Sequence, residues 1–298
     1  PRPAPLRPTA AAAWPVPRQQ PVGAQFRVLC RRYGSVIAAD RFYALFLIAL
    51  PVVLSLLVRI LPGDSGLSVN AQSDAAARLN HVAPGGPQQL LLVLIIAGAF
   101  AGFTGAFREL VKERAIYQRE AAVGLSRVAY LGSKIAVLGV IAVLQALVIA
   151  EFGLIGQRGP DNPLLVRGAA SVVVAVVAVT VVMTMLGLLV SALIHNENRG
   201  MPILVLVLML QLVLCGQLFP VHGQAGLEQA SWLVPSRWAY AMGAATAGVT
   251  AIGEDQDPLW EQHTWTYVAD LGVLLALGAA FVAATSQVLK RREQRRPH

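Results

Sequence analysis

Long apolar runs alternate with short polar segments along most of the chain. A helix needs about 20 mostly apolar residues to cross the hydrocarbon core of a bilayer. Six runs qualify; the second and the fifth are short, but neither contains a charged residue. They are 42–61, 90–107, 135–155, 168–194, 201–219 and 271–289. The pattern predicts an all-α polytopic membrane protein with six transmembrane helices in residues 42–290.

Composition and charge agree with this class and predict an orientation. Hydrophobic residues make up 56% of the chain, and the mean hydropathy is +0.59. With a cytosolic N-terminus, 19 of the 24 Lys and Arg residues fall on the cytosolic side, as the positive-inside rule requires. Both termini are therefore predicted to be cytosolic. The net charge of +8 fits contact with anionic membrane lipids better than binding of nucleic acid.

The segments that flank the spans differ in character. Residues 1–21 are rich in Pro, Ala and Arg and begin with Pro rather than Met, so we expect a linker that follows an upstream domain. Residues 22–41 predict a basic amphipathic helix on the membrane surface, with a solvated linker as the alternative. Residues 291–298 predict a basic cytosolic tail. The apolar face of the predicted helix carries Phe26, Leu29 and Tyr33 at i, i+3 and i+7, and the other faces carry Arg27, Arg31 and Arg32.

A charged, amphipathic stretch separates the second and third apolar runs. Residues 107–134 hold nine charged side chains in a chain that is only 13% charged. We expect a cytosolic helix over 108–123 that docks onto another domain; a merely solvated face is the alternative. Its candidate docking residues are Arg108, Glu109, Lys112, Glu113, Arg114, Arg119 and Glu120.

The last outer segment, 220–266, is the longest and carries several Trp and Tyr residues that suit a membrane interface. Part of it, 227–248, is moderately apolar but is interrupted by Pro235. It is too short to cross the membrane, so we expect a re-entrant or interfacial segment between the fifth and sixth spans.

The sequence lacks the motifs of several kinds of active site. It contains no phosphate-binding P-loop, no H-E-x-x-H, no C-x-x-C and no G-x-S-x-G with a partner His. Its histidines are isolated, and the charged residues Arg59, Glu151 and Asp270 lie near span ends rather than at the midplane. We therefore expect no catalytic site, no metal site and no bound cofactor in this chain.

Within the spans, small and weakly polar residues form a seam. Gly98 and Gly102 make a G-x-x-x-G pair that permits close helix approach. Other seam residues either pack helices together or line an apolar cavity for an amphipathic substrate. They are Phe100, Phe103 and Thr104 in the second span and Gln211 and Leu214 in the fifth.

Three groups of short motifs follow one another along the chain. They are Gln25–Phe26, Arg31–Arg32 and Asp40–Arg41; then Glu113–Arg114, Tyr117, Arg119–Glu120, Gly124 and Tyr130; and finally 215–220 and 230–240. Each motif is loose by itself, but in this order they resemble those of ABC-2-type permeases and above all the ABCG (White) subfamily. The likeness covers roughly residues 22–290.

The resemblance implies an ATP-driven exporter of a lipid, glycolipid or lipophilic compound in a bacterial inner membrane. It implies a nucleotide-binding domain upstream on the same polypeptide, where ATP and Mg bind, in an actinobacterial architecture that includes FHA domains. Residues 22–41 would form the connecting helix, and the charged stretch would transmit ATP-driven motion.

The same resemblance implies a dimer of membrane halves, of which a homodimer is the simplest form. A central cavity would lie between the second and fifth spans, closed by an outer gate at Gln217, Leu218 and Phe219. The family usually has a Leu pair after the Gly, so Gln217 is a departure that leaves room for a polar headgroup to pass.

Two other functions fit the same features. One is a permease of the polysaccharide-export branch, although the Trp residues lie in the outer segment rather than along the spans. The other is a membrane anchor or sensor that regulates an attached cytosolic domain without transporting anything. An intramembrane enzyme is disfavoured because the catalytic groups are missing.

Overall fold

The computed structural model describes residues 20–60, 65–79, 86–161, 169–194, 200–219, 221–249 and 257–294, and the regular structure in these ranges is helical. The predicted linker lies outside the described residues except at positions 20 and 21. The predicted basic tail is described only to Gln294, where the last helix ends.

Among the described residues, five helices are long and apolar enough to cross a membrane, and they coincide with five of the six predicted spans. The chain is thus a multi-pass helical membrane protein. The five are α2 (Arg41–Ile60), α4 (Pro87–Ala106), α7 (Arg127–Leu154), α8 (Ala170–Leu193) and α12 (Thr264–Gln294).

In the fifth predicted span, the helix is shorter than the apolar run of residues 201–219. It is α9 (Gly200–Val213), a helix of 14 residues that ends six positions before residue 219. Gly216 has a φ of +92°, a backbone conformation that suits glycine and is incompatible with a continuing right-handed helix. The boundary therefore follows from the backbone at one glycine rather than from any change in hydropathy.

The central layer of the bundle consists of α4 and α8. In each of them 67% of the apolar stretch is buried, compared with 22% in the outer helices α2 and α12. The G-x-x-x-G pair lies at their contact. A Cβ at Gly102 would lie 2.1 Å from the carbonyl oxygen of Thr180, and Thr184 Oγ1 donates a hydrogen bond to the Gly102 carbonyl at 3.2 Å. The predicted close helix approach is confirmed, and it occurs within the chain.

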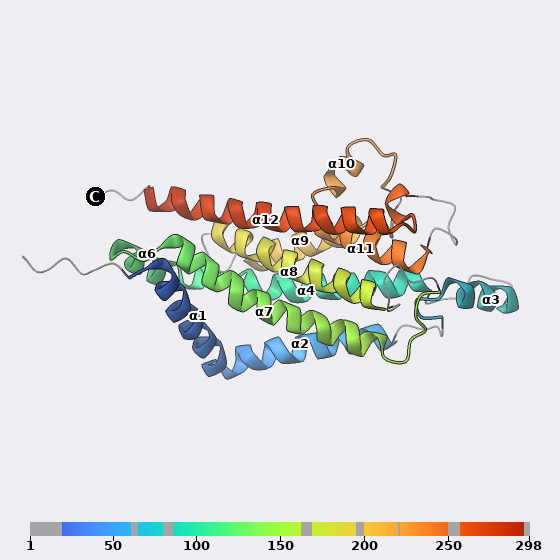
Figure 1. Cartoon of the computed structure of the whole chain (residues 1–298), viewed down its shortest axis with the longest axis horizontal. Coiled ribbons are helices and arrows are strands. Elements are labelled where there is room, and N and C mark those ends of the chain that lie inside the picture. The colour runs from blue at the N-terminus through green and yellow to red at the C-terminus, as the bar shows by residue number, and fades with distance from the viewer. Residues whose placement is uncertain are drawn as a thin grey trace, which may run out of the picture.

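Figure 1 shows two different ends of the bundle. At one end, called here the α6 end, lie α1 (Val22–Ala39), the short α5 (Glu109–Lys112), α6 (Arg114–Ala122) and the last turns of α12. The predicted amphipathic helix is α1, which buries Leu29 and Tyr33.

At the opposite end, called the α11 end, lie α3 (Val69–Leu79), α10 (Leu227–Ser231) and α11 (Pro235–Ala247), with the short helix η3 (Pro258–Trp260) beside α11. All residues of α11 except Trp238 are buried, and it packs against α4, α8 and α12. With 13 residues it cannot cross a membrane by itself. The predicted re-entrant segment is thus an internal helix at this end.

Candidate functional site

A buried lysine organises the α6 end. Lys134 of α7 is 1% exposed, and its Nζ lies 2.8 Å from Glu113 Oε1 and 3.5 Å from Glu109 Oε2. The same nitrogen stands 3.3 Å from the centroid of the Tyr33 ring on α1. A charge removed from water is stable only when it is paired and hydrogen-bonded. Lys134 of α7 therefore holds three elements against α7: α5 through Glu109, the start of α6 through Glu113, and α1 through Tyr33.

Two tyrosines complete this cluster. The Tyr33 hydroxyl donates a hydrogen bond to Glu109 Oε2 at 2.5 Å, and the Tyr130 hydroxyl donates to Glu113 Oε2 at 3.4 Å. Burial, and after it the neighbouring Glu109 charge, raises the pKa of the Tyr33 hydroxyl. It therefore keeps its proton and remains a hydrogen-bond donor to the carboxylate.

A second set of contacts joins α1 to α6 and to the loop that follows α6. Arg32 forms two hydrogen bonds with Glu120 of α6, from Nη1 at 2.5 Å and from Nη2 at 3.2 Å. Hydrogen bonding to Glu120 is the main cause that raises the pKa of the Arg32 guanidinium. Gln25 Oε1 accepts a hydrogen bond from the Ser126 backbone nitrogen at 2.8 Å. These contacts attach α1 to the charged stretch at two further points.

A third set ties the charged stretch to α8 and α12. The Tyr117 hydroxyl donates to Glu293 on α12, and Arg127 pairs with the other oxygen of Glu293 at 3.5 Å. Ser191 Oγ of α8 accepts hydrogen bonds from the first backbone nitrogens of α5, those of Leu110 at 2.9 Å and Val111 at 3.2 Å. The charged stretch therefore contacts α1, α8 and α12 as well as α7.

The predicted docking residues divide into an inner and an outer group. Glu109, Glu113 and Glu120 face α1 and α7 in the pairs given above. Lys112 and Arg119 are exposed. The two remaining members lie elsewhere: Arg108 stacks on the Phe107 ring at 5.3 Å, and Arg114 lines a small cavity. On α1, Arg27 and Arg31 are exposed.

Two exposed apolar side chains accompany the outer group. Ile116 is 48% exposed on α6, and Val123, in the turn that ends α6, is 84% exposed. Exposed aliphatic residues rimmed by cations are typical of a protein–protein contact. The outer face of the charged stretch, defined by Lys112, Ile116, Arg119 and Val123, is called here the docking face.

The predicted cavity residues are mostly involved in packing within the chain. Phe103 is fully buried and stacks on Phe107, with 5.9 Å between ring centroids. Gln211 Oε1 accepts a hydrogen bond from the Ser236 backbone nitrogen at 3.0 Å, which caps the start of α11. Leu214 is buried, whereas Phe100 and Thr104 of α4 are half-buried.

The predicted gate residues follow directly after α9. Gln217 is half-buried, while Leu218 and Phe219 are exposed. These two apolar side chains lie at the α11 end, where about half of each stays exposed in the described part of the chain.

Sequence reasoning missed a buried ion pair beside this segment. Arg237 is 1% exposed, and its Nη2 lies 2.5 Å from Asp257 Oδ2. A Cβ at Gly216 would lie 2.2 Å from Arg237 Nη1, so the guanidinium occupies the space that the glycine leaves free. One signal was available: Arg237 stands in an otherwise uncharged, apolar stretch, where a charged residue usually has a dedicated partner.

A bundle of apolar spans with a charged helical loop at one end and an internal half-length helix at the other is the architecture of a membrane transporter permease. Residues 24–246 match the sequence family described as ABC-2 type transporter. The chain therefore belongs to the ABC-2 type transporter family.

One relative is the ABC transporter ATP-binding/permease protein Rv1747 of Mycobacterium tuberculosis. It is 36% identical to the chain over 265 residues, which cover 87% of this chain and 30% of the relative. The chain thus spans less than a third of that protein, whose name combines an ATP-binding part with a permease.

Proposed function

We propose that this chain is the membrane half of an ATP-driven exporter for a lipid, glycolipid or lipophilic compound. The observation that carries the proposal is the ionic cluster around Lys134. It fixes a short charged helical unit to α1 and α7 and leaves the docking face turned outward. The ATP-binding/permease relative supports an ATPase as the partner of that face.

The chain's own residues supply mechanical coupling in this proposal. An ATPase domain upstream on the same polypeptide binds ATP and Mg, and closure of its dimer presses on Ile116, Arg119 and Val123. The pairs Arg32–Glu120 and Lys134–Glu113 then carry the displacement into α1 and α7. Because these contacts join whole helices, the spans move as units. The substrate site then opens alternately to one side of the membrane and to the other.

A second copy of the chain completes the proposed transport pathway. One side of α9 is apolar and exposed, including Met201, Val205 and Met209. It adjoins α4, which carries the half-buried Phe100 and Thr104. Two such faces opposed across a dimer axis would enclose an apolar cavity, with Leu218 and Phe219 closing its outer end. Gln217 would offer a hydrogen bond to a polar headgroup as it passes.

The test is ATP-dependent movement of a labelled lipid by the full-length polypeptide in sealed vesicles. We expect ATP to expose a fluorescent headgroup on the opposite leaflet, together with ATPase activity stimulated by the lipid. Stimulation by an oligosaccharide that carries no lipid would instead support the polysaccharide-export alternative. ATPase activity that no added compound changes, without lipid movement, would support a regulatory membrane anchor.

A further inference from the structure

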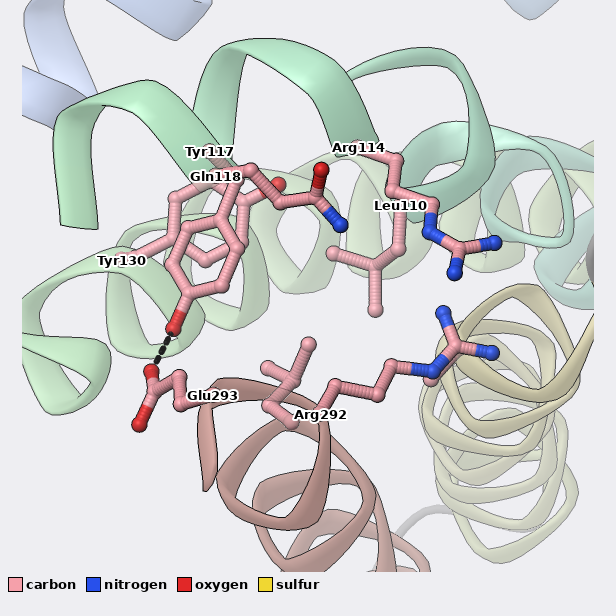
Figure 2. Close-up of a pocket in the computed structure, with 9 residues that line it drawn as sticks. Leu110, Arg114, Tyr117, Gln118, Tyr130, Arg292 and Glu293 are labelled. Atoms are coloured by element: carbon pink, nitrogen blue, oxygen red, sulfur yellow. Dashed lines mark hydrogen bonds between the residues drawn. The ribbon is translucent and has the colours of Figure 1, made fainter. Parts of the chain in front are cut away.

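Two arginines face each other across a small cavity at the α6 end. Arg114 is the first residue of α6, and Arg292 lies in the last turns of α12. Figure 2 shows their guanidinium groups turned toward one another, with Leu110 beside them. The cavity between these helices has a volume of about 20 Å³, enough for one group of the size of a water molecule, such as a single phosphate oxygen. The positive charge of Arg114 acts on Arg292 across this space.

Neither arginine is neutralised by the part of the chain that the structure describes. Glu293 is the carboxylate that lines the cavity, but its oxygens bind Tyr117 and Arg127, and in Figure 2 it points to Tyr117 rather than to the arginine pair. The other glutamates of the charged stretch are also taken, since Lys134 and Arg32 hold them. Because these carboxylates bind other residues, Arg114 and Arg292 face the same cavity without a counter-ion from the described part of the chain.

Arg292 is also held in place. Its Nη2 donates a hydrogen bond at 3.4 Å to the carbonyl oxygen of Leu193, the last residue of α8. A cation is favourable at a helix C-terminus, so this contact orients the guanidinium although its neighbour is another cation. Two facing guanidinium groups repel each other, and a bound anion between them would turn this repulsion into two attractive contacts.

We propose that Arg114 and Arg292 form a binding site for a phosphate group. An arginine fork matches the oxygens of a carboxylate or a phosphate. A planar carboxylate offers its two oxygens on one edge, whereas a tetrahedral phosphate presents oxygens to two forks that arrive from different helices. The phosphate bridges α6 to α12 and, through Arg292, to the end of α8. The site rests on this geometry alone and stands whether or not the proposed export function holds.

Two sources carry this chemistry, the headgroup of an anionic phospholipid and free phosphate. The test uses the delipidated full-length protein in detergent. Its melting temperature is measured with added phosphatidylglycerol, with phosphatidylcholine and with inorganic phosphate. Native mass spectrometry counts the phospholipids that remain bound. The variants are Arg114→Gln, Arg292→Gln and Arg114→Lys. Arg291→Gln is the matched control, because Arg291 is exposed on the same helix and does not line the cavity.

We expect a phosphate-bearing probe to raise the melting temperature of the wild type and of Arg291→Gln. Affinity should fall about 10- to 100-fold in each Gln variant, the effect of losing a charge-assisted hydrogen-bond pair, and less in Arg114→Lys. Without the probe, Arg114→Gln should melt no lower than the wild type, because it has lost a repulsive contact. The direction of this change in melting temperature distinguishes a binding site from a pair of residues that only stabilises the fold.

The result also distinguishes the sources. A shift with phosphatidylglycerol alone identifies a lipid headgroup, and an equal shift with inorganic phosphate identifies a soluble anion. The inference is overturned if both Gln variants respond to every probe as the wild type does, or if Arg291→Gln loses the response equally. It is also overturned if Arg114→Gln melts lower than the wild type when no probe is present.

Discussion

Arg32 of α1 and Glu120 of α6 form an ion pair with two hydrogen bonds across 88 positions of sequence. Their side chains are 44% and 29% exposed. Exposed pairs of this kind contribute only ~0–1 kcal/mol to stability. A substitution in this pair should therefore alter the proposed mechanical coupling without unfolding the protein.

Reversal of the charge at Glu120 tests that transmission. In Glu120→Arg we expect ATPase activity to persist while lipid movement falls, because two arginines then repel each other where α1 and α6 were joined. The free energy of unfolding should change by no more than about 1 kcal/mol. ATPase activity and lipid transport are measured on the same vesicles. The double variant Arg32→Glu with Glu120→Arg should restore coupling, and normal coupling in the single variant would remove the role proposed for this pair.

Removal of the buried cation should affect stability far more. Lys134→Met leaves Glu109 and Glu113 close together and partly or fully buried without their counter-ion. Breaking a buried pair in this way costs about 3–5 kcal/mol. We expect a correspondingly lower melting temperature in detergent. Lys290→Met is the control, since Lys290 is exposed on α12; equal melting temperatures for the two variants would contradict the organising role of Lys134.

Substitution of Gly102 tests the central helix contact. A methyl group there meets the Thr180 carbonyl, and a backbone atom cannot turn aside as a side chain can. We expect Gly102→Ala to destabilise the chain by about 1–3 kcal/mol, the usual cost of overpacking, as measured by thermal unfolding in detergent. Gly139→Ala meets nothing within 4 Å and should be neutral or slightly stabilising. A Gly102→Ala protein as stable as Gly139→Ala would show that α4 and α8 are free to move apart.

The pair at the α11 end makes a parallel prediction. Asp257→Asn leaves the buried Arg237 guanidinium without its carboxylate, which should cost about 3–5 kcal/mol. The nearby Glu261 is exposed, so Glu261→Gln should leave the melting temperature almost unchanged. If Asp257→Asn melts at the same temperature as this control, a group other than Asp257 stabilises the buried charge of Arg237.

Hydropathy located five of the spans because a long apolar helix follows from composition and length alone. Pro235 likewise indicated the re-entrant segment, and the spacing of Phe26, Leu29 and Tyr33 indicated α1. The partners of Lys134 and Arg237 could not be predicted in this way, because they come from other helices and depend on tertiary packing. The same holds for Arg114 and Arg292, which 178 positions separate in the sequence. The early end of α9 depends on one backbone angle inside a uniformly apolar run.

The shortness of α9 has a consequence for the lipid around it. Its 14 residues span ~21 Å at 1.5 Å per residue, whereas the hydrocarbon core of a bilayer is about 30 Å thick. A bilayer in contact with this helix must compress locally or let headgroups sink toward the midplane. In the proposed export function, the polar region of one leaflet is drawn inward beside Leu218 and Phe219, so a headgroup that crosses there meets a thinner hydrocarbon layer. The membrane thinned beside α9 then forms part of the proposed transport pathway.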